Sequence, residues 1–206
     1  MQAIINNPYR ITGTLVGTTA TDDYSFPVLG SLLREVENLN EASSKLKQDN
    51  DKMIAALFWF YKGNSIEDEL ALEALTAGDF RTSLEIWMDS VASDEINKKN
   101  CSAYHNLSTL LLCFAFAGTI VYNGSLFEGT ELKLKYFESD YYVELKTLAT
   151  SQNYKISRTE MELLFLKTVQ QEIEMNSNKD DIFQRFTTLL NDIDFVAKEA
   201  YFDSLI

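Results

Sequence analysis

The chain has 206 residues, 46% of them apolar, which is enough to form a folded core and excludes a disordered chain. Its formal net charge is −13. An acidic surface repels phosphate groups, so we expect neither nucleic acid nor a membrane as a partner. Because we see no secretory leader and no apolar run long enough to cross a bilayer, we expect a cytoplasmic protein.

The cysteines support the same compartment. Cys101 and Cys113 are the two cysteines of the chain and lie in one predicted helix. At about 1.5 Å per residue they stand ~18 Å apart, too far for a disulfide. We therefore expect two reduced thiols, as in an intracellular protein.

Caps and apolar spacing predict helices throughout the first third of the chain. The pattern predicts a helical turn at residues 7–9, a loop over 13–23 and a helix with inward apolar residues over 32–46. Residues 53–62 are apolar nearly all round, which predicts a helix at the centre of the core.

The rest of the chain continues as helices separated by Gly, Asn or Asp. Gly78 is predicted to end one helix and Asp79 to cap the next, and Ser157 with Glu160 forms a capping box. The stretch 119–127 reads as a loop or a short extended piece. The predicted helices span 66–76, 80–91, 101–117, 128–137, 140–150, 157–175, 178–190 and 193–206. No segment alternates as a strand does, so the predicted fold class is all-α.

Residues 78–107 resemble the joint between two tetratricopeptide-type hairpins. Leu70 and Ala71 match the Leu-small pair of a first helix, and Gly78 matches the turn glycine. Ser83 and Trp87 match the small and the aromatic position of the second helix. The resemblance implies antiparallel helical hairpins, stacked as a right-handed solenoid or as a bundle.

A second repeat begins at Tyr104, which matches the first aromatic position, and continues with Leu107 and Ser108 as the Leu-small pair. In such a stack, His105, Thr109 and Leu112 are predicted to point into a concave groove. The groove has few donors for a terminal carboxylate, so we expect an apolar or an intramolecular ligand there.

The start of the chain resembles a J-domain. Residues 7–20 are similar to its opening and residues 39–52 to its third helix and the turn that follows. The only histidine is His105 and the only prolines are Pro8 and Pro27, so the His-Pro-Asp motif is absent. Either the module is degenerate or a segment is missing around Thr21, and we expect no stimulation of a chaperone ATPase.

These resemblances suggest two domains, a degenerate J-domain-like segment at 1–62 and a tetratricopeptide-like domain at 63–206, or one continuous domain. The function they imply is that of a non-enzymatic protein-protein interaction module, an adaptor or co-chaperone-like protein with a protein partner. One alternative is a structural subunit that self-associates into an oligomer or joins a larger assembly. The other is an enzyme with a cryptic carboxylate site.

Evidence for chemistry is thin in the sequence. Cys101 and His105 share a helix face and could form a thiol-imidazole pair, but on an apolar helix they are more often packing residues. The acidic run 67–69 lies at a predicted helix start, where negative charge stabilises the helix dipole. We therefore expect no catalytic residue, no metal and no cofactor.

Overall fold

The computed structural model describes residues 40, 43–44, 46–63, 66–93, 95–116, 124–175 and 179–205. Within these ranges all regular structure is helical, which confirms the all-α prediction for this part of the chain. The helices are α4 (Asp49–Leu57), α5 (Ile66–Thr76), α6 (Phe80–Val91), α7 (Cys101–Phe116), α8 (Ser125–Glu138), α9 (Tyr142–Ala149), α10 (Arg158–Glu174), α11 (Lys179–Asp192) and α12 (Lys198–Asp203). The elements predicted within 7–39 and 117–123 lie outside the described residues.

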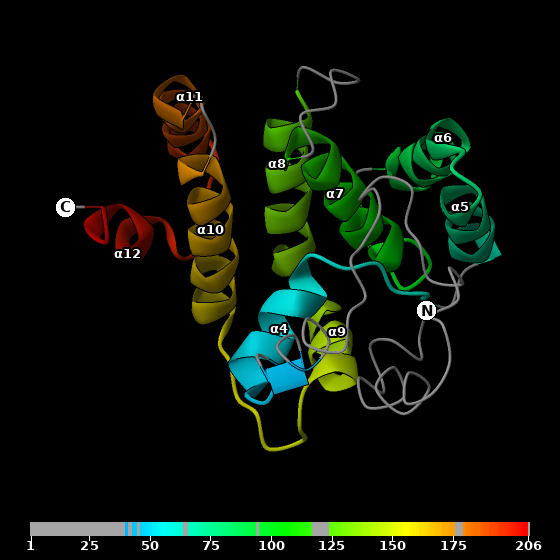
Figure 1. Cartoon of the computed structure of the whole chain (residues 1–206), viewed down its shortest axis with the longest axis horizontal. Coiled ribbons are helices and arrows are strands. Elements are labelled where there is room, and N and C mark those ends of the chain that lie inside the picture. Colours follow the sequence, from blue (N-terminus) through cyan, green and yellow to red (C-terminus); the bar gives the residue numbers. More distant parts are fainter. Residues whose placement is uncertain are drawn as a thin grey trace.

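Helix α7 lies in the interior between two groups of helices. It lies between α8 on one side and the α5–α6 hairpin on the other, with α10 beyond α8 (Figure 1). Thirteen of its 16 residues are buried, so almost no part of its surface meets solvent. Its side chains join two apolar clusters: Tyr104 and Leu112 belong to the one shared with α4 and α8–α12, and Leu107 and Leu111 to the one shared with α5 and α6.

The α5–α6 hairpin forms where the sequence predicts it. Gly78 has a φ of 82°, a left-handed conformation that suits glycine, and the side chain of Asp79 accepts the backbone N–H of Thr82. The hydroxyl of Ser83 donates to the carbonyl of Ala71 at 2.7 Å. The small side chain predicted at position 83 therefore does lie at the contact between the two helices.

Helix α4 differs from its prediction. It spans Asp49–Leu57 rather than 53–62, because Asp49 and Asp51 belong to its first turn and the chain leaves the helix after Leu57. The physical reason lies in Phe60 and Tyr61, which are both buried but in different apolar clusters. A non-helical backbone can send adjacent side chains to opposite sides, whereas a helix places them about 100° apart.

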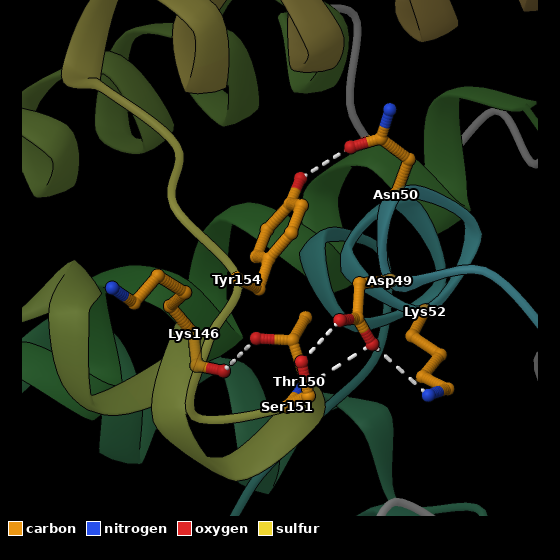
Figure 2. Close-up of polar contacts among 7 residues, drawn as sticks. All are labelled: Asp49, Asn50, Lys52, Lys146, Thr150, Ser151 and Tyr154. Carbon is orange, nitrogen blue, oxygen red and sulfur yellow. Dashed lines mark hydrogen bonds and ion pairs between the residues drawn. The ribbon is translucent and has the colours of Figure 1, made fainter.

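The start of α4 is held by the loop between α9 and α10 (Figure 2). The carboxylate of Asp49 accepts the hydroxyl of Ser151 at 2.5 Å and the ammonium of Lys52 at 3.0 Å. The hydroxyl of Tyr154 donates to the amide oxygen of Asn50 at 2.5 Å. The contacts with Ser151 and Tyr154 join residues about one hundred positions apart in the sequence.

The later helices also follow their caps. Ser157 and Glu160 form the predicted capping box, in which each side chain binds the other residue's backbone N–H. Helix α10 then packs against α4, α8, α11 and α12. The residues of α4 share one apolar cluster with α8–α12, although a domain boundary was predicted at residue 62. That boundary stays a prediction.

Candidate functional site

The most unusual feature of the interior is the non-helical segment 58–63, which follows α4 and passes beside α7. A buried backbone outside a helix or sheet must find hydrogen-bond partners among side chains or water. Here the backbone groups of Leu57, Trp59, Tyr61 and Gly63, at every second position, each bond to a polar side chain of α5, α7 or α8. We call this set of contacts the polar seam.

One end of the polar seam is the amine of Lys133, a fully buried residue of α8. Its Nζ donates to the carbonyl oxygens of Leu57 at 3.0 Å and of His105 at 3.1 Å. It also lies 3.0 Å from Oγ1 of Thr109 and 3.1 Å from Nδ1 of His105. The amine is thus surrounded by acceptors, and the residue closes the gap between α4, α7 and α8.

The bonds of His105 fix its tautomer. Nε2 lies 2.8 Å from the carbonyl oxygen of Trp59, and a carbonyl can only accept, so Nε2 must carry the proton. Nδ1 is then an acceptor for the amine of Lys133. Burial and the neighbouring Lys133 both lower the pKa of His105 well below its usual value, which keeps the imidazole neutral.

The same burial acts on the amine. Desolvation lowers the pKa of Lys133 well below that of a solvated lysine. Four acceptors surround this amine, which has two N–H groups when neutral and three when protonated, so it is hydrogen-bonded in either form although no carboxylate is among those contacts. The amine of Lys133 therefore links two backbone carbonyls and two side-chain acceptors.

The middle of the polar seam is Asn106, on the turn of α7 next to His105. Its amide oxygen accepts the backbone N–H of Tyr61 at 3.0 Å, and its amide nitrogen donates to the carbonyl of Tyr61 at 2.8 Å. The side chain thus pairs with both backbone groups of one residue, as a neighbouring strand would. The ring of Tyr61 lies edge-on to His105 with centroids 5.2 Å apart.

The other end is the carboxylate of Asp68, fully buried on α5. One oxygen accepts from Nε1 of Trp87 at 3.0 Å and from the amide of Asn106 at 3.2 Å. The other accepts the backbone N–H of Gly63 at 3.0 Å and the hydroxyl of Ser102. One side chain therefore ties α5 to α6, to α7 and to the end of the non-helical segment.

Gly63 is required at its place in the polar seam. A β-carbon built there would overlap the side chain of Ser102 and would lie 2.9 Å from a carboxylate oxygen of Asp68. Any larger residue would therefore push α5 and α7 apart and break the hydrogen bond from the backbone of residue 63.

A third buried ionisable side chain, on α10, is also bonded to the backbone of another segment. Glu162 of α10 is fully buried, pairs with Arg158 at 2.7 Å and accepts the backbone N–H of Ala197 at 2.8 Å. Ala197 lies in the linker before α12. In the described part of the chain, Asp68 and Glu162 thus both anchor backbone outside the helices, whereas Lys133 anchors the last carbonyl of α4.

The predicted groove residues lie inside the protein. His105, Thr109 and Leu112 are all buried, and two of them contact Lys133 of α8. The backbone of Trp59 covers His105 from the other side. The predicted open groove is therefore filled in this structure by α8 and by the chain's own segment 58–63.

Cys101 and His105 do not combine into a reactive pair. The thiol of Cys101 points to the carbonyl of Lys98 at 3.7 Å, whereas both ring nitrogens of His105 are engaged by other groups. Burial raises the pKa of the Cys101 thiol, and raises that of Cys113 to about 11, so both favour the unreactive thiol form.

Asp68 and Lys133 carry the polar seam, but neither was predicted from the sequence to be a buried, bonded residue. The spacing of the apolar residues along α5 and α8 does mark these two positions. Asp68 falls on one face with Ala71, Leu72 and Leu75, and Lys133 falls four residues from Phe137 on the buried face of α8. A charged residue within an apolar stripe predicts a buried, bonded charge, but not its partner.

The outer surface offers a contrast with this interior. The large apolar side chains exposed in the described part are Ile66, Leu70, Met88, Val143, Met175 and Val196. Among the described residues, no helix is long and apolar enough to cross a membrane, and no group of three or more potential metal ligands gathers.

Comparison with known proteins gives no relative: no protein-family model, no curated protein and no solved structure matches this chain.

Proposed function

We propose that the chain is a non-enzymatic protein-interaction module, an adaptor or co-chaperone-like scaffold built from stacked tetratricopeptide-type hairpins. The observation that carries the proposal is the division of side chains between core and surface. The groups best suited to chemistry, Lys133, His105 and Asp68, are buried and bonded to the chain's own backbone. In contrast, Ile66 and Leu70 are exposed on consecutive turns of α5.

The polar seam supports this proposal because it fixes the orientation of α5. Asp68 bonds to Trp87 on α6 and to Ser102 and Asn106 on α7. A binding face on α5 would therefore be held rigidly before a partner arrives, which reduces the entropy lost on binding.

The two alternatives make different demands on the molecule. An enzyme with a cryptic carboxylate site needs desolvated carboxylates that act together. Asp68 and Glu162, the fully buried carboxylates of the described part, lie on different helices and bind different groups. A self-associating subunit needs an exposed apolar surface. The scaffold function needs such a surface too, so this feature does not separate the two.

Photo-crosslinking in cells that make the protein tests the proposal. A photoreactive benzoylphenylalanine would replace Ile66, Val143 or Met175, which are exposed apolar residues on three helices or their ends, with exposed Gln152 as the polar control. We expect a crosslink to a different protein from at least one apolar position and none from position 152.

Two outcomes would contradict the scaffold function. Equal crosslinking from all four positions would show that no surface is selected, and the absence of any crosslink would show that no partner is bound. A product of twice the mass of 23.5 kDa that contains only this chain would favour the self-associating subunit.

A further inference from the structure

We infer that the outer face of α5 binds a basic, amphipathic helix of a partner protein. The inference rests on the proposed scaffold function and names the surface and the chemistry of its ligand. The two observations behind it are an exposed apolar pair and a local excess of negative charge on the same hairpin.

The apolar pair lies on a helix with two distinct faces. The side chain of Ile66 is 75% exposed and that of Leu70 is 51% exposed, although Asp68, Ala71 and Leu75 on the opposite face are fully buried. Residues four apart lie one above the other on a helix, at about 6 Å. Ile66 and Leu70 therefore form one continuous apolar strip whose helix cannot turn to bury it, because Asp68 anchors the other side.

The hairpin that carries this strip is strongly acidic. The α5–α6 hairpin, Ile66–Val91, contains seven carboxylates and one arginine in 26 residues, a formal charge of −6 of the chain's −13. That arginine, Arg81, is already paired with Glu85 at 2.8 Å. Glu67 and Glu73 are exposed beside the apolar pair, so cationic side chains of a ligand would find complementary charge there.

An amphipathic helix fits this combination best. Its apolar residues at one-turn spacing match the spacing of Ile66 and Leu70, and flanking Lys or Arg can reach Glu67 and Glu73. Acidic peptides and nucleic acids are repelled by the same charges. One helix face is smaller than a standard interface, so the complex should be weak, with a Kd of roughly micromolar size that rises with salt.

A defined peptide tests the inference with the whole chain. The probe is a fluorescent, helix-forming peptide of about 18 residues, with Leu at one-turn spacing on one face and Lys on its flanks, and the matched peptide carries Glu in place of Lys. Fluorescence anisotropy at low and high salt measures Kd. We expect the Lys peptide to bind at low salt, and the Glu peptide not to bind.

Surface variants locate the site. Ile66→Ser with Leu70→Ser should weaken binding of the Lys peptide at least tenfold, since both apolar contacts are lost. Glu67→Gln with Glu73→Gln should weaken it about fivefold, as expected for two exposed charge pairs. The matched controls are Val143→Ser with Met175→Ser, and Glu172→Gln with Glu174→Gln, which change other exposed positions by the same chemistry. Circular dichroism checks that every variant is folded.

Equal losses in the test and control variants would overturn the inference, because they would show attraction by the net charge alone. Failure of the surface is distinguishable from failure of the scaffold function. Crosslinks from Val143 or Met175, without peptide binding that depends on Ile66 and Leu70, would keep the scaffold function and place its surface elsewhere.

Discussion

Asp68 and Lys133 are buried to the same extent at the two ends of the polar seam, but their polar atoms are accommodated differently. The two oxygens of Asp68 receive donors from Gly63, Trp87, Ser102 and Asn106. A carboxylate has room for four such bonds, so each of these donors is satisfied. Around Lys133, at most three N–H groups face four acceptors, so one acceptor is always short of a proton.

This difference predicts how much each of the two side chains contributes to the stability of the fold. Removal of the carboxylate would leave several donors without a partner, including the backbone N–H of Gly63 and the indole N–H of Trp87. Removal of the amine would leave fewer acceptors unpaired, because the carbonyl of His105 also accepts the hydroxyl of Thr109 at 2.9 Å. We therefore expect the anionic end of the polar seam to contribute more to stability than the cationic end.

The largest expected effect is that of Asp68→Ala. It leaves the donors of Gly63 and Trp87 buried and unpaired, and should lower the free energy of unfolding by about 3–5 kcal/mol. Urea unfolding followed by circular dichroism measures this loss. Asp68→Asn is the matched control: it keeps one acceptor oxygen and should lose clearly less. Equal losses for the two variants would show that packing, not hydrogen bonding, matters at this position.

Lys133→Met comes next, with an expected loss of about 1–3 kcal/mol. Methionine fills a similar volume and removes a desolvated amine, but leaves the carbonyl of Leu57 without its donor. The comparison with Asp68→Ala under identical conditions is decisive. A larger loss for Lys133→Met than for Asp68→Ala would contradict the ranking of the two ends.

The pH dependence of stability tests the protonation state of His105, which contacts Lys133 at one end of the polar seam. His105 is the only histidine, and its folded pKa is well below the unfolded value of about 6.5. Below that pH the unfolded chain binds a proton that the buried ring does not, so the free energy of unfolding must fall as the pH drops from 7 to 5.5. The slope for one proton approaches 1.4 kcal/mol per pH unit.

Urea titrations at pH 7, 6.25 and 5.5 measure that slope, and His105→Gln serves as the control. The variant should be less stable at every pH, because it loses the ring, and its slope over this range should be smaller than that of the wild type, because residue 105 no longer binds a proton in the unfolded chain. A wild-type protein that is equally stable at pH 7 and 5.5 would show that His105 is protonated in the folded state.

The smallest effect is expected at Asp49. Its comparison with Asp68 distinguishes the effect of hydrogen bonding from the effect of burial. Asp49, like Asp68, binds hydroxyl and backbone donors (Figure 2), but its side chain is partly exposed, at 23%. The Ser151 hydroxyl, followed by Lys52, lowers the pKa of Asp49. Its contribution is therefore present above the unfolded pKa of about 3.9 and is lost as the pH falls through the folded pKa.

Ser151→Ala should raise the pKa of Asp49 towards its ordinary value, measured by NMR titration of the carboxyl carbon, with a much smaller change in melting temperature than Asp68→Ala causes. Water can replace the lost donor at the surface but not in the core. A comparable loss in the two variants would contradict the importance of burial.

The helices themselves could be predicted because their signals are local. Gly78 with Asp79 marks the turn before α6, and Ser157 with Glu160 marks the start of α10, since caps act within one turn of the chain. The end of α4 could not be read in this way. The aromatic run 58–61 is compatible with a helix, and only the two apolar clusters and the polar groups of α7 draw it out of one.

By itself, the sequence determined the all-α class, the position of the α5–α6 hairpin and the acidity of its surface, because these depend on residues close together along the chain. Only the tertiary structure decided that His105 lies in a filled interior, that Asp68 bonds the backbone of segment 58–63, and that Lys133 bonds the carbonyl of Leu57 at the end of α4. Their partners lie up to 76 positions away, and no local pattern specifies which buried donor meets which acceptor.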